Sequence, residues 1–154
     1  MEKVIITGGT GAIGLHLTKL LVANFYEVII FTRDPKAYPP QANVRYVHWN
    51  PRKQVIDIKS IQEADYIINL AGAHLNGSRW TKAYQQEIIS SRVESGQLLY
   101  QTLKQVPNQV KAVISASATG WYGADDSYHK KPFEEEIPKV VIFYPGSVSF
   151  GKTA

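Results

Sequence analysis

Short apolar runs alternate along this chain with longer segments in which apolar residues recur at helical spacing. The short runs predict five strands, at residues 3–7, 27–32, 44–49, 64–72 and 111–118. The longer segments predict helices at 13–23 and 80–105. Alternation of this kind predicts an α/β fold in which a parallel sheet is doubly wound, with helices on both of its faces.

The two predicted helices carry further local signals. In the first, Ile13, Leu17, Leu20 and Leu21 fall on one apolar face. In the second, Thr81 is a candidate N-cap, and Pro107 with Asn108 stops the helix.

A glycine-rich loop joins the first predicted strand to the first helix. Gly8, Gly11 and Gly14 fit the spacing G-x-x-G-x-x-G, with Thr10 and Ile13 between them. Glycines at this place permit a tight turn, close approach of a pyrophosphate to the backbone, and close packing of the helix on its strand. The helix N-terminus adds N–H groups and a positive dipole end. We therefore predict a dinucleotide site formed by these five residues, the alternative being an ordinary strand-to-helix turn.

The end of the second predicted strand bears on the choice of cofactor. Thr32 and Arg33 supply hydrogen-bond donors suited to the additional phosphate of NADP. Asp34 follows at once, and an acidic residue near this position is typical of enzymes that use NAD. We expect NADP(H) to be preferred over NAD(H); the alternative is that Arg33 is merely solvated.

Composition and charge narrow the remaining classes of function. The 154 residues suffice for one domain with a core, and 44% hydrophobic with 19% charged residues is typical of a globular protein. The net charge of +4 comes from scattered basic residues, so we expect no nucleic-acid partner. No apolar run reaches membrane-spanning length, no export signal is visible and there is no cysteine, which together favour a cytoplasmic protein. No metal site is predicted.

Four segments occur in an order that resembles a known family: TGGTGAIG (7–14), INLAGA (68–73), RWTKAYQQEIISSRVESGQLL (79–99) and SASATGWYG (115–123). Together they are similar to the atypical, extended short-chain dehydrogenases of the nucleoside-diphosphate-sugar epimerase-like group. The resemblance implies a Rossmann-like NAD(P)-binding domain over residues 1–138, followed by a C-terminal substrate-binding region.

The resemblance also implies particular site residues. It places Leu70 and Ala71 beside the cofactor, and Glu87 and Arg92 on the long helix facing it. From the residues alone, Arg92 is equally well explained as a charge on the helix surface.

SASATGWYG resembles the segment that carries the active-site Ser or Thr in extended enzymes. Ser117 is our catalytic candidate and Thr119 the second, the alternative being a Ser/Ala-rich strand end packed against the cofactor. Tyr122 is a candidate acid or a loop residue covering the cofactor.

Short-chain dehydrogenases commonly pair the Ser with Tyr-x-x-x-Lys, in which the ammonium lowers the pKa of the phenol. Only Tyr100 has a Lys at this offset, Lys104, and both precede the SASAT segment, so we interpret them as a surface pair. The intact relative would be an oxidoreductase or epimerase-like enzyme, whereas this chain is expected to be catalytically incompetent. The alternative is a non-catalytic NADP-binding sensor or interaction module.

The last residues raise a separate question. GSVSFGKT (146–153) matches the P-loop pattern, but no helix follows it and no acidic strand comes later, so we predict no nucleoside triphosphate site. Relatives of the resembled family typically continue here with G-x-D-F-L-x-x-x-C-x-x-W-E. Synonymous codons for KVVIFYPGSVSFGKTA, read two bases out of frame, can encode every residue of that motif at its spacing. We therefore expect residues 139–154 to be an aberrant, frameshifted tail and the substrate-binding region to be lacking. The alternatives are an in-frame deletion and a natural short variant with a sixth strand.

Overall fold

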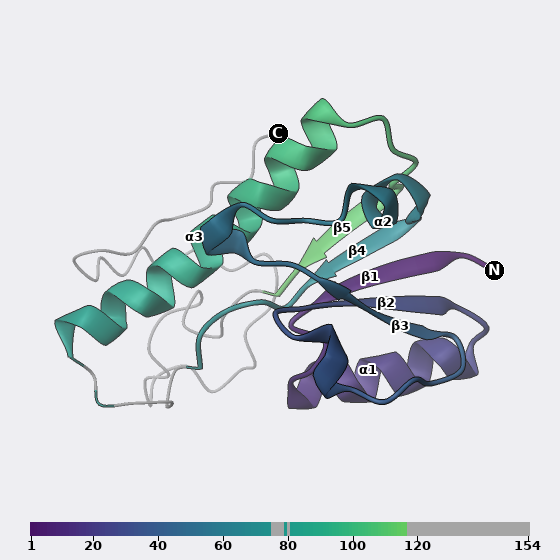
Figure 1. Ribbon diagram of the computed structural model, residues 1–154, viewed down its shortest axis with the longest axis horizontal. Helices are drawn as coiled ribbons and strands as arrows, with labels where there is room; N and C mark the ends of the chain where they lie inside the picture. The colour runs from purple at the N-terminus through teal and green to yellow at the C-terminus, as the bar shows by residue number, and fades with distance from the viewer. Residues whose placement is uncertain (75–78, 80, 117–154) are drawn as a thin grey trace, which may run out of the picture. The chain divides into compact units, whose positions relative to one another are not determined.

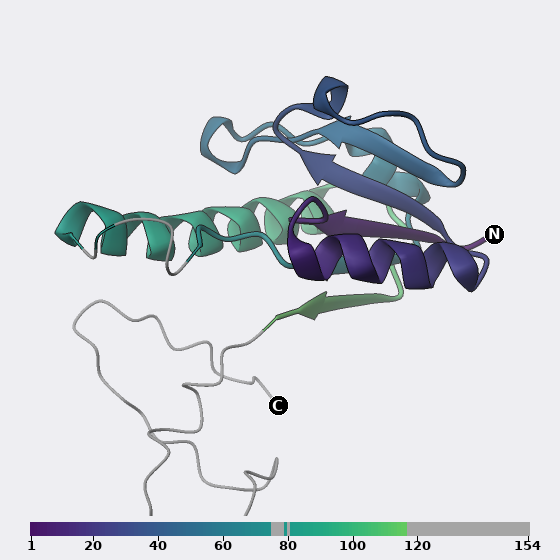
Figure 2. The ribbon, with the colours of Figure 1, turned by 90° about the horizontal axis from the view of Figure 1, so that it is seen from below.

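A five-stranded parallel sheet forms the frame of the computed structural model, which describes residues 1–74, 79 and 81–116. Its strand order is β3-β2-β1-β4-β5, and the arrowheads in Figure 2 all point the same way. The strands are β1 (Lys3–Thr7), β2 (Glu27–Thr32), β3 (Val44–His48), β4 (Tyr66–Asn69) and β5 (Ala112–Ser115). The order reverses between β1 and β4, so the predicted doubly wound, Rossmann-like sheet is confirmed.

Three α-helices and two short 3-10 helices connect these strands. They are α1 (Ala12–Ala23), α2 (Ile58–Glu63), α3 (Lys82–Gln105), η1 (Pro35–Ala37) and η2 (Pro51–Lys53). The hydroxyl of Thr81 accepts a hydrogen bond from the N–H of Tyr84, which confirms Thr81 as the N-cap of α3. Sequence reasoning missed α2, although Asp57 caps it in the usual way by accepting from Ser60 N.

The helices bury the two faces of the sheet separately, and Figure 1 shows the strands between α1 and α3. On one face, Ile61 of α2 and Leu98 and Leu99 of α3 pack against strand residues such as Ile5 and Ile29. On the other face, residues of α1 pack against the cluster Val4, Ile6, Val28 and Ile30. Because both faces are covered, β1 and β2 read as continuous apolar runs rather than alternating ones.

The apolar face predicted for α1 is only half buried. Leu17 and Leu21 pack against the sheet, but Ile13 is 73% exposed and Leu20 is 50% exposed. The buried positions of this helix are instead Gly14 and Thr18. At Gly14 the helix lies against the backbone of Gly8 and Gly9, so no larger residue fits there. The Thr18 hydroxyl donates to the carbonyl of Gly14 at 2.8 Å.

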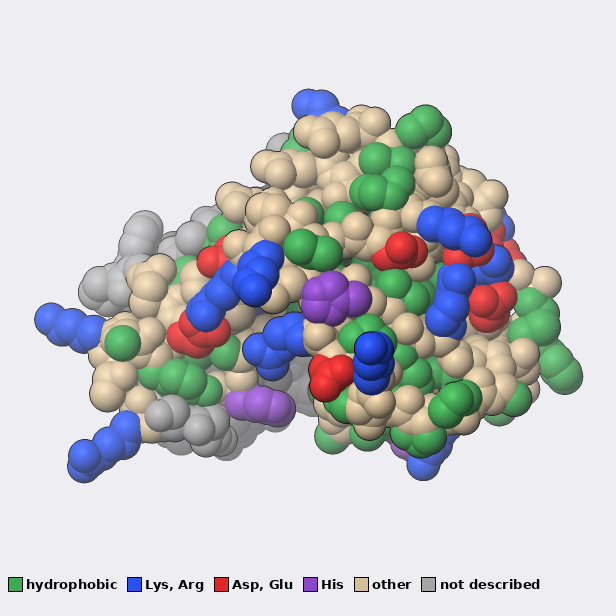
Figure 3. Space-filling model, in the orientation of Figure 1, with side chains coloured by type: hydrophobic (Ala, Val, Ile, Leu, Met, Phe, Trp, Pro, Cys, Tyr) green, Lys and Arg blue, Asp and Glu red, His purple; other side chains and the backbone are tan. Residues whose placement is uncertain are grey.

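Several sequence predictions lie outside the described residues. These are Ser117, Thr119 and Tyr122, the end of the fifth predicted strand, and the whole of residues 139–154 with the P-loop-like sequence. Within residues 1–74, 79 and 81–116, no helix is long and apolar enough to cross a membrane. On the face shown in Figure 3, Lys and Arg side chains are interspersed with Asp and Glu.

A network of ion pairs ties together the amino ends of the strands. Lys3 of β1 donates to Glu63 of α2 at 2.5 Å, and Arg45 of β3 contacts the same carboxylate. These hydrogen bonds from Lys3 and Arg45 hold the pKa of Glu63 below its ordinary value. The pKa of Asp65 is lowered as well, by the hydrogen bond from Lys3 N and that from Lys111. The network therefore depends on the carboxylates remaining ionised.

We predict that Glu63→Gln lowers the stability by about 1 kcal/mol at neutral pH, because two charge-assisted hydrogen bonds to a partly exposed carboxylate are weakened. A carboxyl whose pKa is lower in the folded protein stabilises it above the ordinary carboxyl pKa and ceases to do so as the pH falls. The difference in Tm between wild type and variant should therefore be present at about pH 7 and shrink by about pH 3.5. Glu27→Gln is the matched control, since Glu27 lies 3.8 Å from Lys3 and should matter less. An equal loss for both variants, or a difference independent of pH, would contradict the assignment.

Candidate functional site

The glycine loop lies where the strand order reverses, between the carboxyl ends of β1 and β4. Gly8 has φ of +68°, and a Cβ built there would lie 2.9 Å from the backbone C and O of Leu70. A Cβ on Gly14 would lie 2.4 Å from the Cα of Gly9. Neither position accepts a side chain, so these two glycines are required by the fold itself.

Gly11 differs from these two glycines. A Cβ there would meet only the carbonyl of Gly8, at 3.4 Å, which is ordinary contact. Gly11 is also the N-cap of α1, with extended backbone and no side-chain hydrogen bond to the helix. The first turn of α1 thus presents backbone N–H groups and the positive end of its dipole toward open space beside Gly11. The loop fits an anionic group that approaches the backbone closely, such as a phosphate.

A row of polar side chains crosses the carboxyl edge of three adjacent strands. Thr7 of β1 is fully buried; its hydroxyl donates to Asn69 of β4 at 2.6 Å and accepts from the N–H of Ala71 at 3.2 Å. The amide of Asn69 in turn donates to the hydroxyl of Ser115 on β5 at 3.4 Å. Sequence reasoning missed this row, although each of the three is a polar residue at the end of an apolar run.

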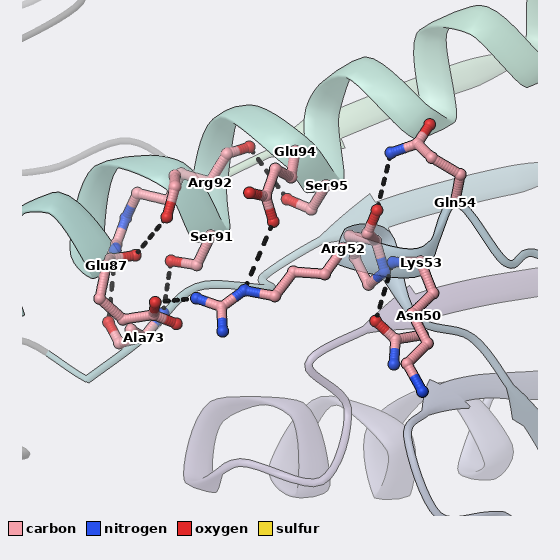
Figure 4. A network of polar contacts seen from close by, with 12 residues as sticks. Asn50, Arg52, Lys53, Gln54, Ala73, Glu87, Ser91, Arg92, Glu94 and Ser95 are labelled. Atoms are coloured by element: carbon pink, nitrogen blue, oxygen red, sulfur yellow. Dashed lines mark hydrogen bonds and ion pairs between the residues drawn. The ribbon is translucent and has the colours of Figure 1, made fainter.

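Residues 70–74, which follow β4, are fastened to α3 (Figure 4). The N–H of Ala73 donates to the hydroxyl of Ser91 at 2.9 Å, and Arg92 Nη1 donates to the carbonyl of Ala73 at 3.3 Å. Arg92 also donates to the carbonyl of Ile88, one helical turn earlier, at 2.9 Å. The backbone of Leu70 and Ala71 thus lies against Gly8 of the glycine loop, and the Arg92 guanidinium holds the carbonyl of Ala73. That Leu70 and Ala71 contact a cofactor stays a prediction.

Glu87, the other predicted residue of α3, forms an ion pair with Arg52. Arg52 belongs to η2, which follows β3, and its Nε lies 3.8 Å from Glu94 two turns further along α3. In Figure 4 the Arg52 side chain extends from η2 across to α3, where both carboxylates meet it. The loop after β3 is thus connected to the helix that holds the loop after β4.

At the end of β2 the side chain of Asp34 is used locally. Its Oδ1 accepts from the N–H of Lys36 at 3.2 Å, which makes it the N-cap of η1. Thr32 is half-buried, and its carbonyl accepts from Trp49 N at 2.9 Å. Arg33 between them is exposed.

The Tyr100–Lys104 pair lies in the last turns of α3, at the amino edge of the sheet rather than beside the glycine loop, and Tyr100 is 66% exposed. Among the residues described, no group of three or more His, Asp or Glu side chains could hold a metal ion.

Comparison with known proteins places these features in context. The sequence model of the NAD dependent epimerase/dehydratase family matches residues 4–147 of this chain. An epimerase family protein of Staphylococcus saprophyticus is 36% identical over 141 residues, and one of Staphylococcus aureus is 36% identical over 140. Each match includes 87% of this chain but 45% of the relative, so the chain spans about half the length of these curated relatives.

Solved structures of related proteins are similar to this chain as well. The human epimerase family protein SDR39U1 (isoform 2) with NADPH matches 78% of this chain and 38% of its own, with 29% identity and a TM-score of 0.61. MoeE5 in complex with UDP-glucose and NAD matches 80% and 39%, with 26% identity and a TM-score of 0.64. The UDP-glucuronic acid 4-epimerase of Bacillus cereus, at 19% identity and a TM-score of 0.69 over 90% and 46%, shares the fold.

We predict that Gly14→Ala destabilises the protein by about 2–3 kcal/mol, because the added methyl group has backbone on its far side and no room to move. Gly11→Ala should cost less than about 1 kcal/mol, since its methyl group meets open space. Thermal unfolding of both variants measures the contrast. Equal losses would show that the loop is not packed as described.

Proposed function

Because this chain belongs to the NAD dependent epimerase/dehydratase family, we propose that residues 1–138 are its dinucleotide-binding half and that they prefer NADP(H) over NAD(H). The family and the neighbouring structures support a nicotinamide dinucleotide, since the neighbours carry NADPH in one case and NAD in another. The choice between the two is a proposal that rests on the end of β2.

The pyrophosphate would be held by the glycine loop. Gly11 lies beside the uncapped first turn of α1, which is where a phosphate gains most from backbone N–H groups and the helix dipole. Thr10 and Ile13 flank this place, and the exposure of Ile13 suits a contact with a ligand better than a role in the core.

The single observation that carries the preference for NADP(H) is the hydrogen bond between Asp34 and Lys36 N. An acidic residue favours NAD by accepting from the ribose hydroxyls. The Oδ1 atom of Asp34 already accepts from its own 3-10 helix, which turns the carboxylate toward η1 and leaves only Oδ2 with all its acceptor sites. Arg33 is exposed, and within the described part of the chain its side chain forms no hydrogen bond or ion pair. We therefore assign Thr32 and Arg33 to the additional phosphate.

Leu70 and Ala71 would form the floor of the site beside the glycine loop. For Glu87 and Arg92 the contacts favour an indirect role, because Glu87 holds Arg52 and Arg92 holds the carbonyl of Ala73. Both would act on the cofactor by fixing the loops after β3 and β4.

When bound, the nicotinamide supplies reversible hydride transfer. We propose that the whole protein acts on a sugar nucleotide, as the UDP-glucose in the MoeE5 structure suggests for a relative. Ser117 would hydrogen-bond a substrate oxygen and Tyr122 would serve as an acid. Residues 1–154 alone would not turn over substrate, because no Tyr-x-x-x-Lys follows β5 in this sequence.

A non-catalytic NADP-binding module is the second candidate. The observation that favours it is the position of Tyr100 and Lys104, which lie at the edge of the sheet opposite the glycine loop and so do not replace the absent pair. Turnover of a sugar nucleotide would favour the enzyme over the non-catalytic module.

We predict that the chain binds NADPH about tenfold or more tightly than NADH, since a charge-assisted hydrogen bond to phosphate is worth roughly 1.5–3 kcal/mol. Calorimetric titration of both nucleotides measures this. Arg33→Ala should remove the preference by weakening NADPH alone. Lys19→Ala, on the exposed side of α1, removes the same charge and should leave the preference intact. Equal affinities of the wild type, or tighter NADH binding, would refute the proposal.

We predict no NADPH-dependent turnover of sugar nucleotides by residues 1–154. The measurements are NADPH consumption, followed by absorbance, and the conversion of UDP-sugars, followed by chromatography, because an epimerase returns the hydride and consumes no net cofactor. Ser117→Ala is the control that identifies any signal as enzymatic. Turnover by the wild type that Ser117→Ala abolishes would overturn the incompetence of this chain and exclude the non-catalytic candidate.

A further inference from the structure

The backbone at the end of β2 is held by two consecutive residues, the last residue of β3 and the one that follows it. His48, the last residue of β3, pairs in register with Thr32. The ring of His48 lies across the strand end, with Nδ1 2.9 Å from the carbonyl oxygen of Arg33. The next residue, Trp49, donates its N–H to the carbonyl of Thr32 at 2.9 Å. The carbonyls of Thr32 and Arg33 are therefore fixed one after the other.

The chemistry of this contact determines the state of the imidazole. A carbonyl oxygen can only accept, so Nδ1 must carry the proton and donate it. The bond fixes the peptide plane after Arg33 and, with it, the direction in which the side chain of Arg33 leaves the backbone. Trp49 is 4% exposed and packs against Phe31. The chain next to His48 is therefore anchored in the core.

We propose that His48 is a positioning residue for the discrimination between NADP(H) and NAD(H), acting through Arg33. This inference rests on the proposed function, which assigns Arg33 to the additional phosphate of NADP. A guanidinium on an exposed, rotamer-rich side chain loses entropy when it binds. A fixed backbone at residue 33 reduces the part of that loss that comes from the main chain, and the gain appears only with the ligand that Arg33 touches.

The variants His48→Ala and His48→Asn separate the hydrogen bond from the rest of the ring. Asn carries its amide nitrogen the same number of bonds from Cα as His carries Nδ1, so it can donate to the same carbonyl. Calorimetric titration of the full chain with NADPH and NADH should show NADPH affinity reduced about threefold to tenfold in His48→Ala, the effect of one lost hydrogen bond. NADH affinity should stay within about twofold. His48→Asn should restore most of the loss.

A double-mutant cycle with Arg33→Ala tests whether His48 acts through Arg33. In the Arg33→Ala background, His48→Ala should no longer change the affinity for NADPH. Equal weakening of both nucleotides in His48→Ala, or an undiminished effect in the Arg33→Ala background, would assign His48 a merely structural role and overturn the inference. If instead the wild type binds NADPH and NADH equally well, the proposed function fails. That result differs from a failure of the His48 inference, in which the wild type prefers NADPH but His48 does not affect this preference through Arg33. If His48→Ala does not fold, His48→Asn against His48→Gln, whose amide is one bond further from Cα, provides the same comparison.

Discussion

The close approach of the glycine loop to the strand end of β4 is the constraint on which the rest of this fold depends. Gly8 leaves no room for a side chain against Leu70, and Gly14 leaves none against Gly9. These two contacts hold the start of α1 against the loop that follows β1, and set its first turn at the reversal of the strand order. The same packing explains why the buried positions of α1 are the small residues Gly14 and Thr18, beside the partly buried Leu17 and Leu21. The geometry that makes the site possible is thus also what the core requires.

The two edges of the sheet use polar residues for different purposes. At the amino edge, Lys3, Arg45 and Glu63 join strands and helix in ion pairs whose contribution depends on ionised carboxylates. At the carboxyl edge, neutral side chains such as Thr7 and Asn69 satisfy one another within the sheet. This edge carries backbone donors at α1 and a cation at Arg33, and therefore suits an anionic ligand. Parallel strands make the division possible because all their carboxyl ends meet on one side.

Much of the fold could be predicted from the sequence because its signals are local. Apolar runs of strand length and the cap at Thr81 fixed the main elements to within a few residues. What was missed is either short or depends on tertiary contact. α2 has six residues, too few to show a helical period, and the buried side of α1 depends on the glycine contacts rather than on hydrophobicity. Periodicity identifies an apolar face but does not say how much of that face another element will cover.

The candidate site shows the same limit at single residues. The glycine spacing predicted the loop, because the backbone there has few alternatives, but a charged residue has many possible partners. The sequence alone does not indicate that Asp34 also caps η1 through its Oδ1 atom. Glu87 was predicted to face the cofactor from the long helix, and the sequence did not indicate that Arg52 pairs with it from a loop 35 residues away. What residues 32–34 can bind therefore depends on the contacts that η1, His48 and Trp49 make to them, and not on their side-chain types alone.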